Sequence, residues 1–176
     1  MDAVEPFAFY GAYYVSIYTG LRARTLSEMV DALASVDGGA IFHHFFHKVR
    51  EKHLMPPQYF DDFALWVGES LGRRDLAMAI TQISGREPKT VEDVRRELIE
   101  IMTPHADAAP AKSPFVFVSM EPVVYKTKYV ARDLGQFLDA VAEVPDESIV
   151  YHFVTRRVLE GAKRNDFSRW LAEAGL

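Results

Sequence analysis

Histidines gather in one short stretch of the chain and could bind a metal ion. Four of the six histidines lie between residues 43 and 53, and two carboxylates follow shortly after them. On a helix, His43 and His47 are four residues apart and project from the same face. Imidazole nitrogens together with a carboxylate oxygen form a donor set that zinc and iron accept. The candidate ligands for a divalent transition metal are His43, His44, His47, His53, Asp61 and Asp62.

The alternative interpretation of these histidines is a hydrated polar helix face. The segment lacks the glutamate that makes the short zinc-protease signature specific. The other side of the same helix is apolar, with Ile41, Phe42, Phe45 and Phe46. An amphipathic helix of this kind needs no metal to explain its polar side, so the sequence leaves both interpretations open.

His44 also belongs to a pattern that recurs in the last third of the chain. The segment 41–45 has a counterpart at 149–153, and His152 lies 108 positions after His44. Each histidine precedes an Asp-Phe-x-x-Trp segment. Recurrence favours a structural role, in which each histidine bonds a backbone carbonyl or a capping carboxylate near its own helix. Residues expected to share this role are His152, Asp166, Trp66 and Trp170. In the alternative, His44 and His152 face one another and share a ligand.

Aromatic residues near the N-terminus could form a binding surface. Rigid aromatic side chains dominate interface energetics and also stack on sugars, and neighbouring arginines can contact phosphate. Ordinary packing within a sheet is the alternative. The candidate partner or ligand surface consists of Tyr10, Tyr13, Tyr14, Tyr18, Arg22 and Arg24.

The composition places the chain among globular proteins. It has 176 residues, 49% of them hydrophobic and 26% charged, which is enough apolar surface to bury a core. A net charge of −5 argues against nucleic acid as a partner. No apolar run approaches the ~18 residues that a membrane span needs, and the absence of cysteine fits a reducing compartment. We therefore expect a soluble cytoplasmic protein.

Alternating aromatic and β-branched residues predict the strands. Residues 7–18 show this alternation, and residues 115–118 and 123–130 show it more clearly. The latter two segments flank Met120-Glu121-Pro122, which is typical of a hairpin turn.

A helix is expected after each strand region. Thr25 can cap the first helix, with Glu28 three residues later to complete a capping box. Asp133 and Gln136 repeat this arrangement in the last third of the chain. The elements that must position the histidines therefore recur together with them.

These recurrences predict an internal duplication. The expected fold is α+β and predominantly α-helical, with an internally duplicated unit, a short β-hairpin followed by two or three helices, in a pseudo-twofold arrangement. The first repeat with its extra C-terminal helices covers residues 1–103, a Pro- and Ala-rich linker covers 104–113, and a shorter second repeat covers 114–176. The two repeats are expected to pack as one compact body, because a second domain of about 60 residues would have a marginal core.

The combination of Phe-x-Phe, Ala-Arg-x-Leu, His-Phe and Asp-Phe-x-x-Trp segments resembles a family of small bacterial and archaeal proteins catalogued only as a domain of unknown function. The resemblance covers most of the chain and implies no activity and no cofactor. His43 and His47 do not belong to the family pattern. The best-matching residues are Arg24, Leu26, Ile41, His44, Asp62, Phe63 and Trp66.

The favoured function is a non-catalytic binding or regulatory module that acts through protein–protein contact, with a protein partner or a homo-oligomer. The sequence contains no Gly-rich phosphate loop with its lysine, no nucleophile elbow and no paired-cysteine metal motif. One alternative is a metal-binding protein or metal-dependent enzyme that uses the histidine cluster. The other is recognition of a sugar or phosphosugar. Whether the protein is an enzyme stays open.

Overall fold

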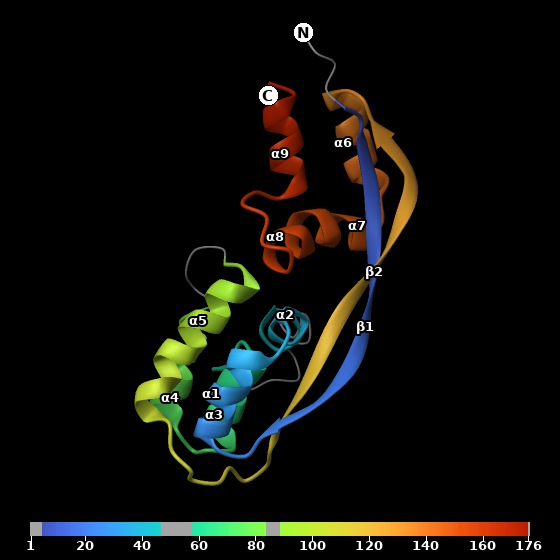
Figure 1. The fold of residues 1–176 in the computed structure, drawn as a ribbon. Coiled ribbons are helices and arrows are strands. Elements are labelled where there is room, and N and C mark those ends of the chain that lie inside the picture. Colours follow the sequence, from blue (N-terminus) through green and yellow to red (C-terminus); the bar gives the residue numbers. More distant parts are fainter. Residues whose placement is uncertain (1–4, 47–57, 84–88, 176) are drawn as a thin grey trace. The chain divides into compact units, whose positions relative to one another are not determined.

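The computed structural model describes residues 5–46, 58–83 and 89–175. Two strands of equal length form one antiparallel sheet: β1 spans Phe7–Ala23 and β2 spans Phe115–Ala131 (Figure 1). The chain divides into two compact units. Unit 1 consists of Met1–Val15 and Pro122–Leu176, and unit 2 consists of Ser16–Glu121. Each strand therefore contributes one half to each unit.

The predicted hairpins are wrong. Residues 115–118 and 123–130 belong to the same continuous strand, β2. Pro122 was expected in a turn. Its backbone nitrogen instead points to the same edge of β2 as the N–H of Val118, and that N–H bonds the side chain of His44 and not β1. Because N–H groups alternate between the two edges of a strand, the N–H that Pro122 lacks would not have paired with β1.

The fold is therefore not the one expected. A duplicated unit of a hairpin followed by helices, in a pseudo-twofold arrangement, is contradicted by the single long strand at each place. The structure is α+β, with 52% of the described residues in helices and 22% in strands.

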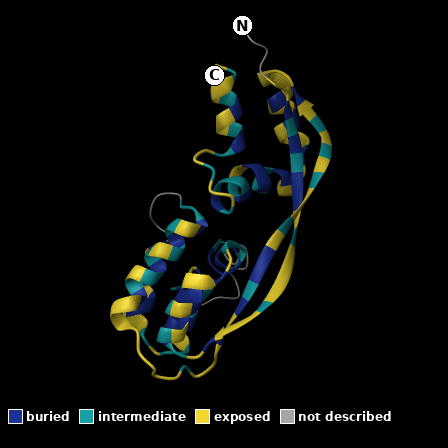
Figure 2. Cartoon of the chain, viewed as in Figure 1, coloured by how far each residue is buried: buried dark blue, intermediate teal, exposed yellow. Residues whose placement is uncertain are grey.

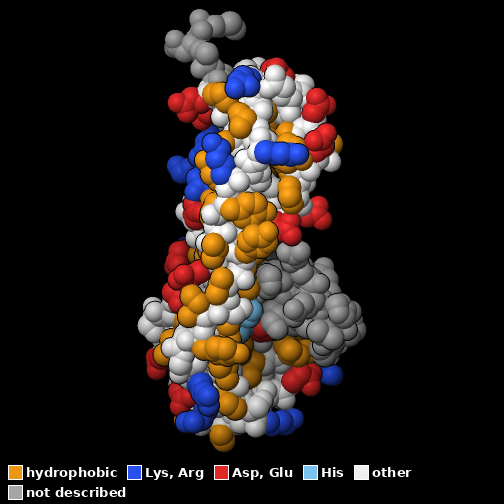
Figure 3. Space-filling model, turned by 90° about the vertical axis from the view of Figure 1, so that its right-hand side faces the viewer, with side chains coloured by type: hydrophobic (Ala, Val, Ile, Leu, Met, Phe, Trp, Pro, Cys, Tyr) orange, Lys and Arg blue, Asp and Glu red, His pale blue; other side chains and the backbone are white. Residues whose placement is uncertain are grey.

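The described residues leave part of the sheet uncovered. At the beginning of each strand the side chains alternate between buried and less buried, but Val15, Ser16, Ile17 and Tyr18 in the middle of β1 are all exposed (Figure 2). Hydrophobic side chains follow the strands on the face shown in Figure 3. The described helices leave this part of β1 open on both faces.

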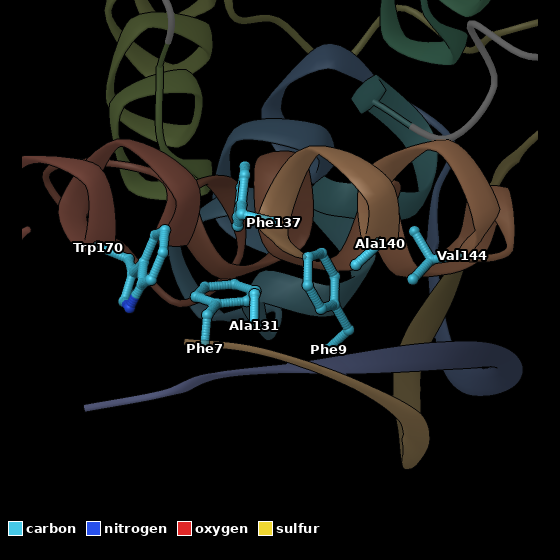
Figure 4. Packing of buried hydrophobic residues seen from close by; sticks show 7 residues of the cluster. All are labelled: Phe7, Phe9, Ala131, Phe137, Ala140, Val144 and Trp170. Carbon is cyan, nitrogen blue, oxygen red and sulfur yellow. The ribbon is translucent and has the colours of Figure 1, made fainter. Parts of the chain in front are cut away.

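Unit 1 buries the beginning of β1 under helices from the end of the chain. The helices are α6 (Leu134–Glu143), α7 (Asp146–Val150), a π-helical turn (Tyr151–Thr155), α8 (Arg156–Val158) and α9 (Asp166–Glu173). The indole of Trp170 stacks on the ring of Phe137 at 5.1 Å between centroids, and Phe7 and Phe9 pack beneath them (Figure 4). The buried cluster consists of Phe7, Phe9, Ala131, Phe137, Ala140, Val144 and Trp170.

Unit 2 buries the beginning of β2 under the remaining helices. They are α1 (Leu26–Ser35), α2 (Gly38–Ile41), a π-helical turn (Phe42–Phe46), α3 (Asp62–Glu69), α4 (Arg74–Thr81), α5 (Val91–Met102) and a 3₁₀ turn (Thr103–His105). Phe115 stacks on Phe63 at 5.1 Å, and Phe117 is fully buried beside them.

The predicted caps at Thr25 and Asp133 are confirmed, but the reciprocal bond of the predicted capping box goes to the residue before Thr25 and not to Thr25 itself. Thr25 accepts the N–H of Glu28, whose carboxylate accepts the N–H of Arg24. Asp133 caps α6 in the same way, with the N–H of Gln136 as donor. These local bonds satisfy N–H groups that a helix start leaves without a partner.

The predicted linker lies within unit 2. Its last residues are tied to that unit by backbone hydrogen bonds, from the N–H of Ala111 to the carbonyl of Arg24 and from the N–H of Lys112 to the carbonyl of Ser70. The division into residues 1–103, 104–113 and 114–176 stays a prediction.

Candidate functional site

His152 is buried in unit 1 and both of its ring nitrogens are hydrogen bonded. Nε2 lies 2.8 Å from the backbone nitrogen of Tyr10, and Nδ1 lies 2.8 Å from Oδ2 of Asp166. Because a backbone N–H can only donate, Nε2 accepts, and the proton of the neutral ring is on Nδ1 and points at the carboxylate. The π-helical turn that carries His152 presents the ring to the edge of β1.

His44 makes the corresponding contacts in unit 2. Its Nε2 accepts the N–H of Val118 over 2.9 Å, and its Nδ1 lies 2.7 Å from Oδ2 of Asp62. His44 is buried and also belongs to a π-helical turn. Each histidine therefore covers one edge N–H of the sheet, a group that would otherwise lack a partner in a dry environment.

Among the described residues, the carboxylate beside His152 has more hydrogen-bond partners than the one beside His44. Asp166 also accepts from Nε of Arg156 at 3.2 Å and from a terminal nitrogen of Arg169 at 2.9 Å. Burial alone would raise the pKa of Asp166, but the hydrogen bond from His152 and the two guanidinium charges outweigh it and lower the pKa. Asp166 is therefore an ionised, fully bonded carboxylate.

A pocket lies beside each histidine. The one beside His152 measures about 400 Å³ and the one beside His44 about 450 Å³. In the first pocket, the wall includes Glu5, Tyr10, Tyr151, Arg156, Trp170 and Glu173. In the second, it includes Leu65, Trp66, Glu69, Ser70 and Val116.

The histidines have the geometry of a structural clamp. A His–Asp pair is also part of hydrolase triads, but there Nε2 must be available to take a proton from the nucleophile. In both units a backbone N–H occupies that nitrogen. Neither ring has a lone pair left for a metal ion, because Nδ1 carries its proton toward the carboxylate. The pairs hold strands to helices, and neither of these two histidines has a ring nitrogen free for acid–base chemistry.

The tryptophans strengthen the same clamps. The indole N–H of Trp66 donates to the carbonyl of Ser113, and that of Trp170 donates to the carbonyl of Glu5, each over 2.8 Å. Each bond fixes the residues that lead into a strand. Asp61 and Asn165, each directly before the aspartate of an Asp-Phe-x-x-Trp segment, cap α3 and α9.

Only part of the predicted metal cluster lies within the described residues. His47 and His53 fall outside them, so no geometry joins them to His43 or to the carboxylates. Within the described ranges, no group of three histidine, aspartate or glutamate side chains lies close enough together to hold a metal ion. Metal binding that involves His47 or His53 stays a prediction.

The structure separates the predicted tyrosine surface into two pairs. Tyr10 packs on the ring of His152, and the hydroxyl of Tyr14 bonds that of Thr155, so these two belong to the packing of unit 1. Tyr13 and Tyr18 are 62% and 82% exposed, and Tyr13 stacks on the ring of Tyr125. The two predicted arginines, Arg22 and Arg24, are also exposed.

Some contacts of the site were not predicted from the sequence. Arg156 and Arg169 bond Asp166, and Arg169 follows it by three residues, a spacing that brings side chains together on a helix. This spacing could have predicted the contact between Arg169 and Asp166. Tyr10 and Val118 contribute backbone N–H groups, for which a sequence carries no signal.

Asp61 is a buried carboxyl group with one satisfied oxygen. Its Oδ1 caps α3 by accepting the N–H of Ala64 over 2.8 Å, while Oδ2 has no hydrogen-bond partner within the described ranges. Burial raises the pKa of Asp61 to about 7, although the bond from Ala64 works in the other direction. In the folded protein the protonated form is therefore favoured below about pH 7.

We expect Asp61→Asn to remove a pH-dependent loss of stability. The folded protein holds this proton more tightly than the unfolded chain, whose aspartate has its ordinary pKa of 3.8. The free energy of unfolding therefore falls as the pH rises from 3.8 to about 7. Asparagine caps helices equally well and does not ionise, so the variant should exceed the parent by up to a few kcal/mol above pH 7.

Urea unfolding at pH 5 and pH 8 measures this difference. Asp61→Ser, which keeps a capping oxygen and cannot ionise, is the matched control and should show the same loss of pH dependence. If the free energy of unfolding changed by the same amount between pH 5 and pH 8 in the parent chain as in Asp61→Asn, the assignment would be contradicted.

None of the helices in the described part of the chain has the length and hydrophobicity that crossing a bilayer requires. Fold and site together define an α+β protein in which buried His–Asp pairs clamp the edges of a two-stranded sheet. The chain belongs to the family described as "Family of unknown function (DUF5752)", which matches residues 4–176 and confirms the resemblance to an uncharacterised family.

A solved structure is similar over nearly the whole chain. It is described as "The structure of OrfY from Thermoproteus tenax" and is 55% identical in sequence, with a TM-score of 0.90. The match covers 98% of this chain and 80% of that chain. No curated protein matches the sequence.

Proposed function

We propose that this protein is a non-catalytic binding module that acts through protein–protein contact at β1. The observation that carries the proposal is the exposed apolar surface of this strand. Tyr18 is 82% exposed, and its neighbours Val15 and Ile17 are exposed as well. Aromatic side chains that stand free of the core contribute strongly when a partner buries them.

The backbone of β1 supports the same function. From Phe7 to Leu21 the strand contains no charged residue and no proline, which are the features that protect strand edges from pairing with other chains. The edge N–H of Tyr10 is covered by His152. By the alternation of the strand, Ser16 and Tyr18 present their N–H groups to the same edge, and both residues are exposed. A partner strand could pair there.

The clamps support a binding module over an enzyme, because the two described His–Asp pairs are fully used in holding the fold. The absence of cysteine fits action in the reducing cytoplasm, where we place this contact. No observation favours the sugar alternative, which stays a prediction.

Photo-crosslinking from position 18 tests the proposal. We expect protein with p-benzoylphenylalanine in place of Tyr18 to form one defined adduct in an extract of the source cells. Glu92, an exposed residue of α5, is the matched control position and should give no such adduct. Mass spectrometry then identifies the partner. An adduct pattern that does not differ between the two positions would refute contact at β1.

A further inference from the structure

The two strands of the sheet differ in how their outer edges are protected. On β2 the even-numbered residues present their N–H groups to the outer edge, as Val118 does. This edge is blocked in several ways, because His44 covers the N–H of Val118, Pro122 has no N–H, and Lys126 and Lys128 carry charge. Such features prevent a strand from pairing with another chain.

The outer edge of β1 is open over a short stretch. On one side of this stretch, the outward N–H of Tyr10 is covered by His152. On the other side, Gly20 has a φ of +79°, which departs from the extended geometry of a strand. Between them, Ser16 and Tyr18 present their backbone N–H and C=O groups outward, and both residues are exposed. The stretch contains no charged residue and no proline.

One register lets this stretch pair with itself. When two β1 strands run antiparallel with Ile17 opposite Ile17, Ser16 of each copy lies opposite Tyr18 of the other. Each of these pairs exchanges two backbone hydrogen bonds, because the donors and acceptors of both residues are on the same edge. The arrangement has a twofold axis at Ile17 and uses the same surface of both copies.

The side chains are compatible with the same register. Val15 lies opposite Thr19 on either side of the central Ile17 pair, so the row consists of β-branched residues. Pairs of this kind stabilise a sheet, whereas like charges opposite one another destabilise it. No such repulsion arises within the stretch, although the whole chain has a net charge of −5. Val15 and Ile17 are 49% and 39% exposed in the single chain, and a second copy would cover them.

We propose that the partner at the open edge of β1 is a second copy of this protein, paired antiparallel about Ile17. This inference rests on the proposed function, because it names the partner for the contact at β1. The difference between the two edges carries it. The edge of β2 is protected against pairing with other copies, whereas the edge of β1 is not, and every copy in solution offers the same open stretch. Because β2 is blocked, pairing ends at a dimer and does not continue into a fibre.

Single cysteines test the register, because the chain has no cysteine of its own. Residues opposite one another in a non-hydrogen-bonded pair have Cα atoms about 4.5 Å apart, within reach of a disulfide. We therefore expect Ile17→Cys to form a linked dimer with oxidised glutathione. Val15→Cys and Thr19→Cys should each stay unlinked on a non-reducing gel, because each residue lies about 14 Å from its own copy. A mixture of these two variants should form a linked dimer. Glu92→Cys, in α5, is the matched control and should stay unlinked.

Sedimentation velocity tests the backbone pairing without an introduced cysteine. The parent chain should show a concentration-dependent dimer. Ser16→Pro gives β1 the block that β2 has at Pro122 and should raise the dissociation constant about tenfold or more, because each copy loses one hydrogen bond. Ser16→Ala keeps the N–H and should dimerise like the parent. If Ser16→Pro is not folded by circular dichroism, Ser16→Lys is the second test variant, since lysine also protects strand edges.

These measurements distinguish the identity of the partner from the contact itself. A parent chain that is a monomer at every concentration tested, or linked dimers that form equally at Ile17 and Glu92, would overturn pairing between copies. A linked dimer of Val15→Cys alone would overturn the register. If the parent is a monomer but the crosslinker at Tyr18 captures a different protein, contact at β1 stands and the second copy is the wrong partner. A monomer that gives no adduct would overturn both proposals.

Discussion

Residues 1–103 and 114–176, expressed as separate fragments, are each expected to be unfolded, and mixing them should restore the fold. The core of unit 1 needs both fragments, because Phe7 and Phe9 come from the first and Phe137 and Trp170 from the second. Truncating a buried phenylalanine to alanine costs about 3–5 kcal/mol. Without Phe7 and Phe9 the second fragment loses most of the stability that a small domain has.

The core of unit 2 also needs residues from both fragments. Phe115 and Phe117 belong to the second fragment, while Phe63 and His44, on which they pack, belong to the first. Neither fragment can therefore complete a unit alone. We expect random-coil amide spectra for each fragment by NMR and a dispersed spectrum for the equimolar mixture.

Variants of the first fragment sharpen this test. Phe9→Ala should weaken reconstitution strongly, since Phe9 is fully buried in unit 1. Tyr18→Ala, on the exposed part of the same strand, is the matched control and should leave reconstitution intact. A dispersed spectrum from the isolated second fragment would show that residues 114–176 fold without Phe7 and Phe9, which contradicts the expectation.

Local patterns were sufficient for the helices and insufficient for the sheet. The caps at Thr25 and Asp133 depend on contacts three residues apart, and such spacings can be read directly from a sequence. The path of β2 depends on which edge Pro122 occupies, and that is decided by pairing with β1 across about a hundred residues. A proline between two alternating segments favours a turn only when no such partner strand is known.

The candidate site shows the same limit. The recurrence of His44 and His152 pointed to a structural role, and each bonds the aspartate of the next Asp-Phe-x-x-Trp segment. The other hydrogen-bond partner of His152 is the backbone N–H of Tyr10, which is 142 positions away in the sequence. Side-chain patterns cannot predict a bond to a backbone group at that distance, because every residue except proline carries the same N–H.

Replacement of either clamp histidine by phenylalanine is expected to lower the free energy of unfolding by about 2–4 kcal/mol. In His152→Phe the ring volume is largely kept, but the N–H of Tyr10 loses its acceptor and Asp166 loses its donor. Arg156 and Arg169 still hold Asp166, so the orphaned backbone N–H carries much of the cost. Urea unfolding followed by circular dichroism measures the loss.

His152→Gln separates the two halves of the clamp. Its side-chain oxygen can reach the place of Nε2 and accept the N–H of Tyr10, whereas the donor to Asp166 is lost. It should therefore be about 1–3 kcal/mol more stable than His152→Phe, the cost of one unsatisfied buried N–H. Hydrogen exchange at the amide of Tyr10 reports on the same bond and should be fastest in His152→Phe. If His152→Phe were as stable as the parent and the Tyr10 amide equally protected, the histidine would have no part in covering the edge of β1, and its two ring nitrogens would again be candidates for chemistry.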